Sequence, residues 1–371
     1  MSRRIGTITR AWALRLHRWV GLALGGVLLV SGGSGLLLLS GDWLERGIEP
    51  GLFAPAPGAR ASIDSVVEAL RRTHPDLPLV RLRLPRDEGD VYEAWLQHDG
   101  GPRAYVDPVT AEVRGTRSKA GTVKGSVFVL HTELLSGSLG HVLVGIGALS
   151  LLFLTLSGLV LWWPGVAHLR RGFTLRRGRR LADAHSIGGL ITAPVLVLIA
   201  VTATSLVFPA RFQILLDTVT PGGPRAGAPP WHGGGSAQPG NVAALLASAE
   251  AALPGGHVSW LYFPPASGGW FVVRKRLPGE RHPNGKSFAY IDATTGVVNR
   301  AVDARQNGIS ARFFDSLYPA HIGRTLGVAP HAIAAIALVA LVITGWTVWW
   351  QRRAARRGRR NVSAPVRRTA P

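Results

Sequence analysis

The residues of this chain that could do chemistry are its histidines. The sequence has 371 residues, with 12 His, no Cys and one Met, at its first position. Because the chain has no Cys, it cannot form disulfides, Cys-ligated iron–sulfur clusters, thiolate sites or a covalently attached c-type haem. A soft or borderline metal would therefore have to be held by imidazole. Six His form three pairs at matching places in the two halves of the sequence: His17 with His185, His131 with His321, and His141 with His331.

Each of these pairs stands at the start of a long apolar segment. A helix needs roughly 20 apolar residues to cross a bilayer, and four segments qualify, at about residues 19–39, 141–163, 187–208 and 328–350. Histidines at membrane depth are costly and are functional candidates for that reason. One interfacial His is often only a hydrogen-bonding residue, but three matched pairs favour a site.

The charge distribution predicts how the segments cross the membrane. The net charge is +21, and residues 1–18, 164–180 and 351–371 hold 19 of the 42 basic residues and no acid. All three stretches fall on one side of a four-span topology, which the positive-inside rule makes the cytoplasm. We therefore attribute these arginines to membrane topology and expect no nucleic-acid partner. We expect a bacterial inner-membrane protein with membrane lipid around it, an uncleaved first span and both termini cytoplasmic.

The expected fold is a helical membrane protein with four transmembrane helices, built as a tandem repeat of span, outer domain and span. Each periplasmic loop carries a helix candidate (residues 62–72 and 241–252) and a matching turn segment, Ala104–Val113 or Ala289–Val298. Between them lie strand-like runs, at residues 79–84 and 91–97 in the first loop and at 258–263 and 270–276 in the second. Each loop therefore reads as a small α+β domain with about three strands. The expected divisions are 1–41, 42–130, 131–163, 164–183, 184–208, 209–320, 321–350 and 351–371, in which the first, third, fifth and seventh contain the spans.

Imidazole pairs near both membrane faces suit two b-type haems with bis-His ligation. His17 and His185 would hold the haem near the cytoplasm. Near the outer face, either His131 and His321 or His141 and His331 would ligate the second haem, and depth alone favours His141 and His331, which lie further into the apolar segments. His131 and His141, like His321 and His331, are ten residues apart, which in a continuous helix is about 15 Å of rise. One His of each such pair could then ligate the haem while the other contacts a propionate, relays a proton or faces the substrate.

Four segments resemble the signatures of PepSY-associated transmembrane proteins. They are Leu16-His-Arg-Trp-Val-Gly-Leu22, Leu130-His131 followed by Gly140, Ala184-His-Ser-Ile-Gly-Gly-Leu190, and Tyr318-Pro-Ala-His-Ile-Gly323. The Tyr-Val/Ile-Asp-x-x-Thr segments resemble the PepSY strand–turn–strand. The likeness covers nearly the whole chain, and members of the family include ferric-siderophore reductases with two haems.

The resemblance implies His17, His131, His185 and His321 as haem-iron ligands, with His141 and His331 as second choice. Family members more often have Arg after the third His, where this chain has Ser186. Arg18 keeps the corresponding place in the first segment and is the candidate propionate partner.

The favoured function is a di-haem membrane reductase. It would pass electrons from a quinol or a cytoplasmic reductase to a periplasmic ferric siderophore and release Fe(II). No catalytic acid–base pair or nucleophile is expected, because the haem carries the electron. The alternatives are a non-enzymatic envelope regulator, since soluble PepSY domains are associated with peptidase inhibition, and a His-based metal transporter. Aromatic and cationic residues of the outer loops could grip an anionic chelate, although such residues are more often plain structure and none is favoured individually. They are Trp43, Trp95, Trp231, Trp260, Trp270, Arg81, Arg83, Arg274, Lys275 and Arg276.

Overall fold

The computed structural model describes residues 2–41, 43–97, 101–220, 227–232 and 239–362. The chain divides into two compact units. The membrane unit comprises Met1–Leu39, Leu130–Val207 and His321–Pro371, and the sheet unit comprises Ser40–Val129 and Phe208–Ala320.

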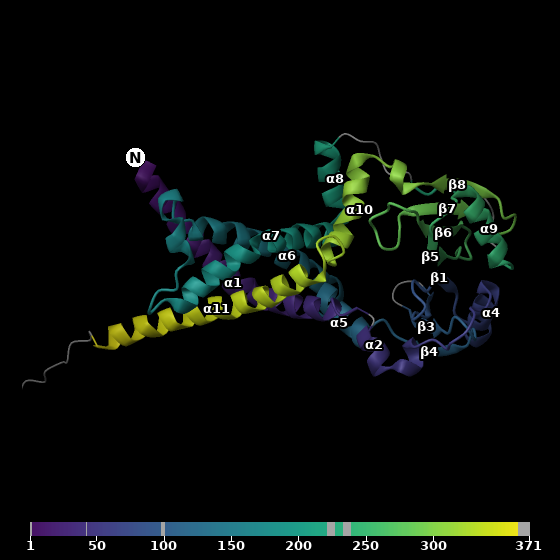
Figure 1. Ribbon diagram of the computed structural model, residues 1–371, viewed down its shortest axis with the longest axis horizontal. Helices are drawn as coiled ribbons and strands as arrows, with labels where there is room; N and C mark the ends of the chain where they lie inside the picture. Colours follow the sequence, from purple (N-terminus) through teal and green to yellow (C-terminus); the bar gives the residue numbers. More distant parts are fainter. Residues whose placement is uncertain (1, 42, 98–100, 221–226, 233–238, 363–371) are drawn as a thin grey trace, which may run out of the picture. The chain divides into compact units, whose positions relative to one another are not determined.

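Four long apolar helices make up the membrane unit (Figure 1): α1 (Ser2–Leu38), α6 (Gly137–Trp162), α7 (Arg180–Val207) and α11 (Val328–Val362). Each contains a candidate membrane span of 26 to 30 residues, long and apolar enough to cross a bilayer. Helix α6 packs along α7, and α1 contacts both α6 and α11. The chain is therefore a membrane protein, and its candidate spans lie where the hydropathy predicts them.

Small residues let these helices approach closely. A Cβ atom on Gly147 would lie 2.9 Å from Val27, and one on Gly32 would lie 3.2 Å from Leu338. Since lipid tails are as apolar as leucine, such close packing is what holds membrane helices together. Gly32 and Gly147 therefore serve helix packing. The buried core of the unit consists of Leu28, Leu151, Leu196, Ala200, Ala334 and Leu338.

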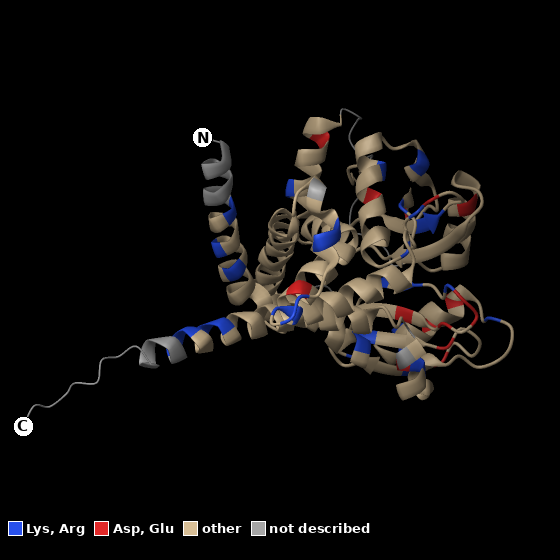
Figure 2. Cartoon of the chain, turned by 60° about the vertical axis from the view of Figure 1, so that its left-hand side comes forward, with Lys and Arg blue, Asp and Glu red and all other residues tan. Residues whose placement is uncertain are grey.

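Arginines are concentrated at helix ends of this unit. Figure 2 shows Lys and Arg, and no Asp or Glu, along the described N-terminal part of α1 and the C-terminal part of α11. Charged groups are tolerated there because helix ends reach the membrane–water interface.

Two short helices precede the second and fourth spans and are separated from them by breaks. Helix α5 (Val123–Glu133) ends before α6 begins at Gly137, and Leu134 and Leu135 between them have φ angles of +48° and +57°. A Cβ atom on Gly140 would overlap the carbonyl oxygen of Glu133 at 1.5 Å, so this turn requires glycine.

The second break lies between α10 (Ile309–His321) and α11. Gly323 and Gly327 have φ angles of +76° and +91°, which glycine adopts at no steric cost. His321 and His331 are therefore on different helices, as are His131 and His141. The 15 Å of rise that a continuous helix would place between the two histidines of each segment therefore does not apply.

The sheet unit contains one antiparallel sheet of eight strands in the order β4-β3-β2-β1-β5-β6-β7-β8. The strands from the first loop are β1 (Leu79–Arg83), β2 (Tyr92–Leu96), β3 (Arg103–Val106) and β4 (Val113–Arg117). Those from the second loop are β5 (His257–Tyr262), β6 (Phe271–Arg276), β7 (Ser287–Ile291) and β8 (Val298–Val302). Each loop contributes four strands, where the sequence predicts about three. Pairing of β1 with β5 joins the two sets into one sheet.

Helices α4 (Ile63–Thr73) and α9 (Val242–Ala252) cover one face of this sheet and agree with the predicted helices within two residues. Ser62 and Asn241 cap their first turns by accepting the backbone N–H of Ser65 and Ala244. The core between helices and sheet includes Val66, Leu70, Leu82, Leu245, Leu261 and Phe271.

The two predicted turn segments have the same local structure. Asp107 Oδ1 accepts the N–H groups of Val109 and Thr110, and Asp292 Oδ1 accepts those of Thr294 and Thr295, at 2.7 to 3.0 Å. Such Asx turns reverse the chain between antiparallel strands. The smaller elements of the chain are α2 (Trp43–Ile48), α3 (Pro50–Phe53), α8 (Pro209–Val219), η1 (Val166–Phe173) and η2 (Ala304–Gln306).

Candidate functional site

Four of the predicted histidines form two pairs of neighbouring rings in the membrane unit. The first histidine pair is His17 on α1 and His185 on α7, with ring centroids 6.4 Å apart and ring planes at 86°. The second histidine pair is His131 on α5 and His321 on α10, with centroids 6.2 Å apart and planes at 44°. Residues more than 160 positions apart thus meet in pairs that the sequence predicts.

Both separations fit a metal ion ligated from two sides. A metal–imidazole bond is about 2 Å long, so two bonds in line place the ring nitrogens about 4 Å apart, and adding about 1 Å from each nitrogen to its ring centre gives about 6 Å. The centroid separations of both pairs therefore match that of two imidazoles that share one metal ion.

Each of the four imidazoles also contacts a hydroxyl group on a neighbouring helix through its Nδ1 atom. The partners are Ser157 for His17 at 2.8 Å, Thr344 for His185 at 3.0 Å, Ser34 for His131 at 3.1 Å, and Thr202 for His321 at 3.0 Å. Metal-bound histidines commonly use their second nitrogen in this way, which fixes the ring orientation.

The hydroxyl protons determine which ring nitrogen is protonated. Each hydroxyl donates its own proton to a backbone carbonyl of its helix, at 2.6 to 3.2 Å. Its oxygen therefore accepts the Nδ1–H of the histidine. This leaves the lone pair on Nε2, the form in which imidazole binds metal.

A glycine follows three of these four hydroxyl residues and makes room for the ring. A Cβ atom would lie 3.1 Å from His131 Cε1 at Gly35, 3.5 Å from His17 Cε1 at Gly158, and 3.4 Å from His185 Cε1 at Gly345. The sequence analysis did not identify the hydroxyl residues. Their signal was the repeated dipeptide Ser/Thr-Gly, at 34–35, 157–158 and 344–345, with Thr-Ala at 202–203.

Arg18, the predicted propionate partner, lies next to the first histidine pair in sequence. Its Nε atom is buried without a hydrogen-bond partner among the described residues, and its guanidinium lies 5.5 Å from the ring centre of Trp19. A buried donor of this kind favours an anionic group that the protein chain does not itself supply. Ser186, where the family more often has Arg, donates to the carbonyl of Ala182 on its own helix.

His141 hydrogen-bonds to the last turn of α5, and His331 hydrogen-bonds to the break before α11. His141 Nδ1 lies 3.2 Å from the carbonyl oxygen of Thr132, and His331 Nδ1 lies 3.1 Å from that of Gly327. Since His131 and His321 form the facing rings, the geometry favours them over His141 and His331 for a ligand pair. Across the described ranges, no group of three or more His, Asp or Glu forms a metal site.

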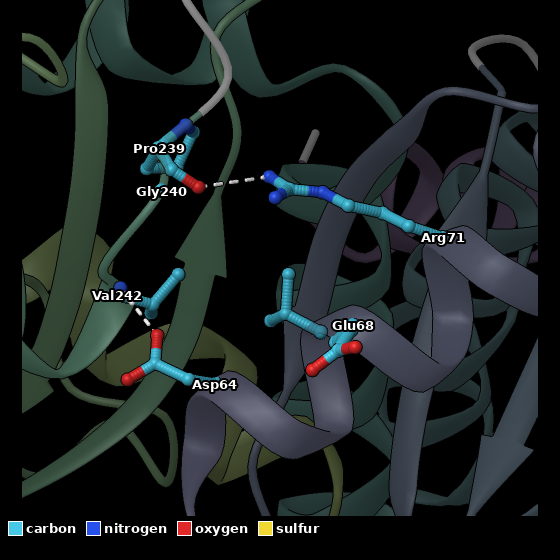
Figure 3. A pocket seen from close by; sticks show the side chains of 7 residues that line it. Asp64, Glu68, Arg71, Pro239, Gly240 and Val242 are labelled. Atoms are coloured by element: carbon cyan, nitrogen blue, oxygen red, sulfur yellow. Dashed lines mark hydrogen bonds between the residues drawn. The ribbon is translucent and has the colours of Figure 1, made fainter.

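The sheet unit has a pocket between α4 and the start of α9 (Figure 3). Its polar groups are used in joining the two helices. Asp64 accepts the N–H of Val242 at 2.6 Å, and Arg71 donates to the carbonyl of Pro239 at 3.1 Å. We therefore assign this pocket a structural role.

The aromatic and cationic residues expected in the outer loops divide into two groups. Trp95, Trp260 and Arg81 meet on the sheet face opposite α4 and α9. Lys275 instead reaches the helix side, where it is 1% exposed, pairs with Glu250 and donates to the carbonyl of Leu253 at 2.5 Å.

Comparison with known protein families yields one match. The model of the PepSY-associated TM region matches residues 14–352, which is nearly the whole chain. A comparison with curated proteins finds no match.

Proposed function

Since this chain belongs to the PepSY-associated transmembrane family, we propose that it is a haem-dependent membrane oxidoreductase of the ferric-siderophore reductase type. It takes electrons from a quinol or a cytoplasmic reductase and passes them to a ferric siderophore on the other side of the membrane, releasing iron as Fe(II). It holds two b-type haems, one at each histidine pair.

The observation that carries this proposal is the pair of facing imidazoles, present twice, with every Nδ1 atom bonded to a hydroxyl. A purely structural histidine needs only one hydrogen-bonding partner. It does not need a second imidazole at the spacing of a shared metal, nor a helix partner that fixes Nε2 as the free nitrogen.

When bound, a haem supplies a one-electron Fe(II)/Fe(III) couple. The chain's own residues orient it and tune it. The paired imidazoles would hold it, the Ser and Thr hydroxyls fix the imidazole tautomer, and Arg18 would pair with an anionic propionate. Reduction of a siderophore's iron weakens the complex, because hard oxygen ligands favour Fe(III) over Fe(II).

The proposed topology follows from the arginines. Both termini and residues 164–183 lie in the cytoplasm, and the sheet unit lies in the periplasm of a bacterial inner membrane. We also infer that the chain arose by tandem duplication, since His17 and Ser157 correspond to His185 and Thr344. The two PepSY-like domains are then the two halves of the shared sheet.

The function is tested with the purified protein reduced by dithionite and freed of excess reductant. A ferric siderophore is mixed with it, and absorbance of the haem α band and Fe(II) capture by a chromogenic chelator are followed together. We expect stoichiometric reoxidation of the protein with one Fe(II) formed per electron lost. Stable reduced protein in the presence of every ferric chelate tried would contradict the reductase function.

A further inference from the structure

The sheet face opposite α4 and α9 carries a continuous row of arginine and aromatic side chains. Residues paired across neighbouring strands lie on the same face of a sheet. From β4 to β8, the register aligns one residue of each strand: Arg117, Arg103, Trp95, Arg81, Tyr262, Val272, Tyr290 and Arg300. We call this set the arginine row. It contains four arginines and no acid.

The adjoining row on the same face adds two arginines and one carboxylate. Its residues from β4 to β8 are Gly115, Tyr105, Glu93, Arg83, Trp260, Arg274, Phe288 and Val302. Glu93 pairs with Arg83 at 3.1 Å and with Arg103 at 3.2 Å, so it is already neutralised within the face. Arg117 at the edge of the sheet pairs with Glu49 at 3.4 Å, and Arg274 donates to the carbonyl of Gly285 at 2.7 Å. The cationic character of the face is therefore centred on Arg81.

Arg81 stands at the centre, where β1 and β5 lie side by side and join the two halves of the sheet (Figure 1). Its guanidinium lies 4.7 Å from the ring centre of Trp95 and 5.7 Å from that of Trp260. Among the described residues, no carboxylate or carbonyl pairs with it. Partial burial lowers the pKa of Arg81, but an arginine guanidinium remains charged even so.

Trp260 provides an independent sign that a partner is missing. Trp260 is only 9% exposed, and its Nε1–H is buried and has no hydrogen-bond acceptor within the described ranges. Buried indole N–H groups normally have an acceptor. Arg81, whose nearby carboxylate Glu93 is already paired with Arg83 and Arg103, and a buried indole N–H without an acceptor in the described ranges thus lie close together on one face.

We propose that this face, centred on Arg81, Trp95 and Trp260, binds the anionic iron chelate that the protein reduces. The inference rests on the proposed function for the identity of the ligand. Arginine forks bind anionic oxygens bidentately, and aromatic rings contact flat, delocalised ligands. The site therefore selects chelates by charge: it favours an anionic tris-catecholate complex over a neutral tris-hydroxamate complex.

The test measures binding without electron transfer. Gallium(III) complexes of the two ligand types are titrated into the full-length protein in zwitterionic nanodiscs by calorimetry. We expect the anionic complex to bind more tightly, with an affinity that falls as salt is raised. Arg81→Gln should weaken its binding about tenfold or more, the loss typical of a charge-assisted hydrogen bond. Arg72→Gln on α4 is the matched control, because it removes an arginine charge that is 72% exposed on the helix side, and it should bind like the parent.

Equal affinity for the two complexes, or an Arg81→Gln variant that binds like the parent, would overturn the assignment. Because gallium is not reduced and binding does not require haem, this outcome is separate from failure of the reductase function. A haem-free protein that still binds the anionic complex would contradict only the electron-transfer proposal.

Discussion

At the scale of single residues, the four facing histidines lead to a simple expectation about haem content. Replacing His17 with Ala removes one of two ligands at the first histidine pair and leaves the second pair intact. We expect purified His17→Ala to retain about one haem per chain instead of two, measured by pyridine haemochrome assay. His141→Ala is the control, since the ring of His141 hydrogen-bonds to the carbonyl of Thr132 in α5, and it should retain both haems. Two haems in His17→Ala would refute the pairing with His185.

The hydroxyl residues give a second prediction, on reduction potential. Thr344 accepts the Nδ1–H of His185, which makes that imidazole a stronger electron donor to a bound metal. Thr344→Val removes the acceptor with little change in shape, so the potential of one haem should rise by about 20–60 mV, the one-electron equivalent of one hydrogen bond. Thr344→Ser should restore the parent value in a spectroelectrochemical titration. An unchanged potential in the Val variant would show that the contact does not act on the ligand.

These hydroxyl partners show where sequence reasoning about the site reached its limit. The histidines were predictable because ionisable residues are rare in apolar segments. Ser34, Ser157, Thr202 and Thr344 are ordinary in such segments, where their hydroxyls usually bond to their own helix. Only the packing of α1 on α5, or of α7 on α11, reveals which hydroxyl meets which ring.

At the scale of elements, glycines of α1 can be told apart by what they face. A Cβ atom on Gly35 would press on His131 at 3.1 Å, whereas one on Gly33 would meet nothing within 4 Å. Gly35→Ala should displace the ring and speed haem transfer to apomyoglobin by about tenfold, as loss of ligand support does. Gly33→Ala, two residues away on the same helix, should release haem at the parent rate. Equal rates for both variants would argue against a ligand role for His131.

Helix α9 and strand β6 give a prediction about pH. A hydrogen bond from Lys275 lowers the pKa of Glu250, with help from the N–H of Gly255. A carboxyl with a lowered folded-state pKa stabilises the fold above its unfolded pKa and loses that contribution as pH falls. Glu250→Gln should therefore destabilise the sheet unit at neutral pH, by no more than about 1 kcal/mol because Glu250 is half exposed.

At an acidic pH below the lowered pKa of Glu250, where the carboxyl is protonated in the parent as well, the difference should shrink toward zero. Pulse proteolysis in urea at both pH values checks this. Glu68→Gln serves as the control, since the Glu68–Arg72 pair is exposed on both sides and contributes little. A loss of stability for Glu250→Gln that is the same at both pH values would show that the ionised pair is not its cause.

The elements themselves differed in how far the sequence predicts them. The strands and helices of the outer loops follow from alternating and helical patterns and lie within two residues of their expected positions. The fourth strand in each half and the joining of β1 to β5 do not, because that pairing links residues about 180 positions apart and leaves no local signal. The helix breaks after His131 and His321 were also missed. Leu134 and Leu135 look helical, and only their positive φ angles show the turn.

At the scale of the whole molecule, the chain is a membrane protein with four candidate spans and an eight-stranded sheet unit. Charge served as a guide at this scale too. Residues 1–18, 164–180 and 351–371 carry 19 of the 42 basic residues and no acid, so they account for nearly all of the excess of +21 and predict topology. The four arginines of the arginine row lie in the sheet unit and add little to the excess, because the rest of the chain has 23 basic against 21 acidic residues. Neither set of arginines requires nucleic acid.

The central claim is that the two histidine pairs hold haem, and an absorption spectrum of the detergent-purified protein tests it most directly. The oxidised and dithionite-reduced forms are recorded, with a pyridine haemochrome count per chain. We predict a Soret band, sharp reduced α and β bands, and about two b-type haems. A colourless protein purified from haem-replete cells would contradict the account.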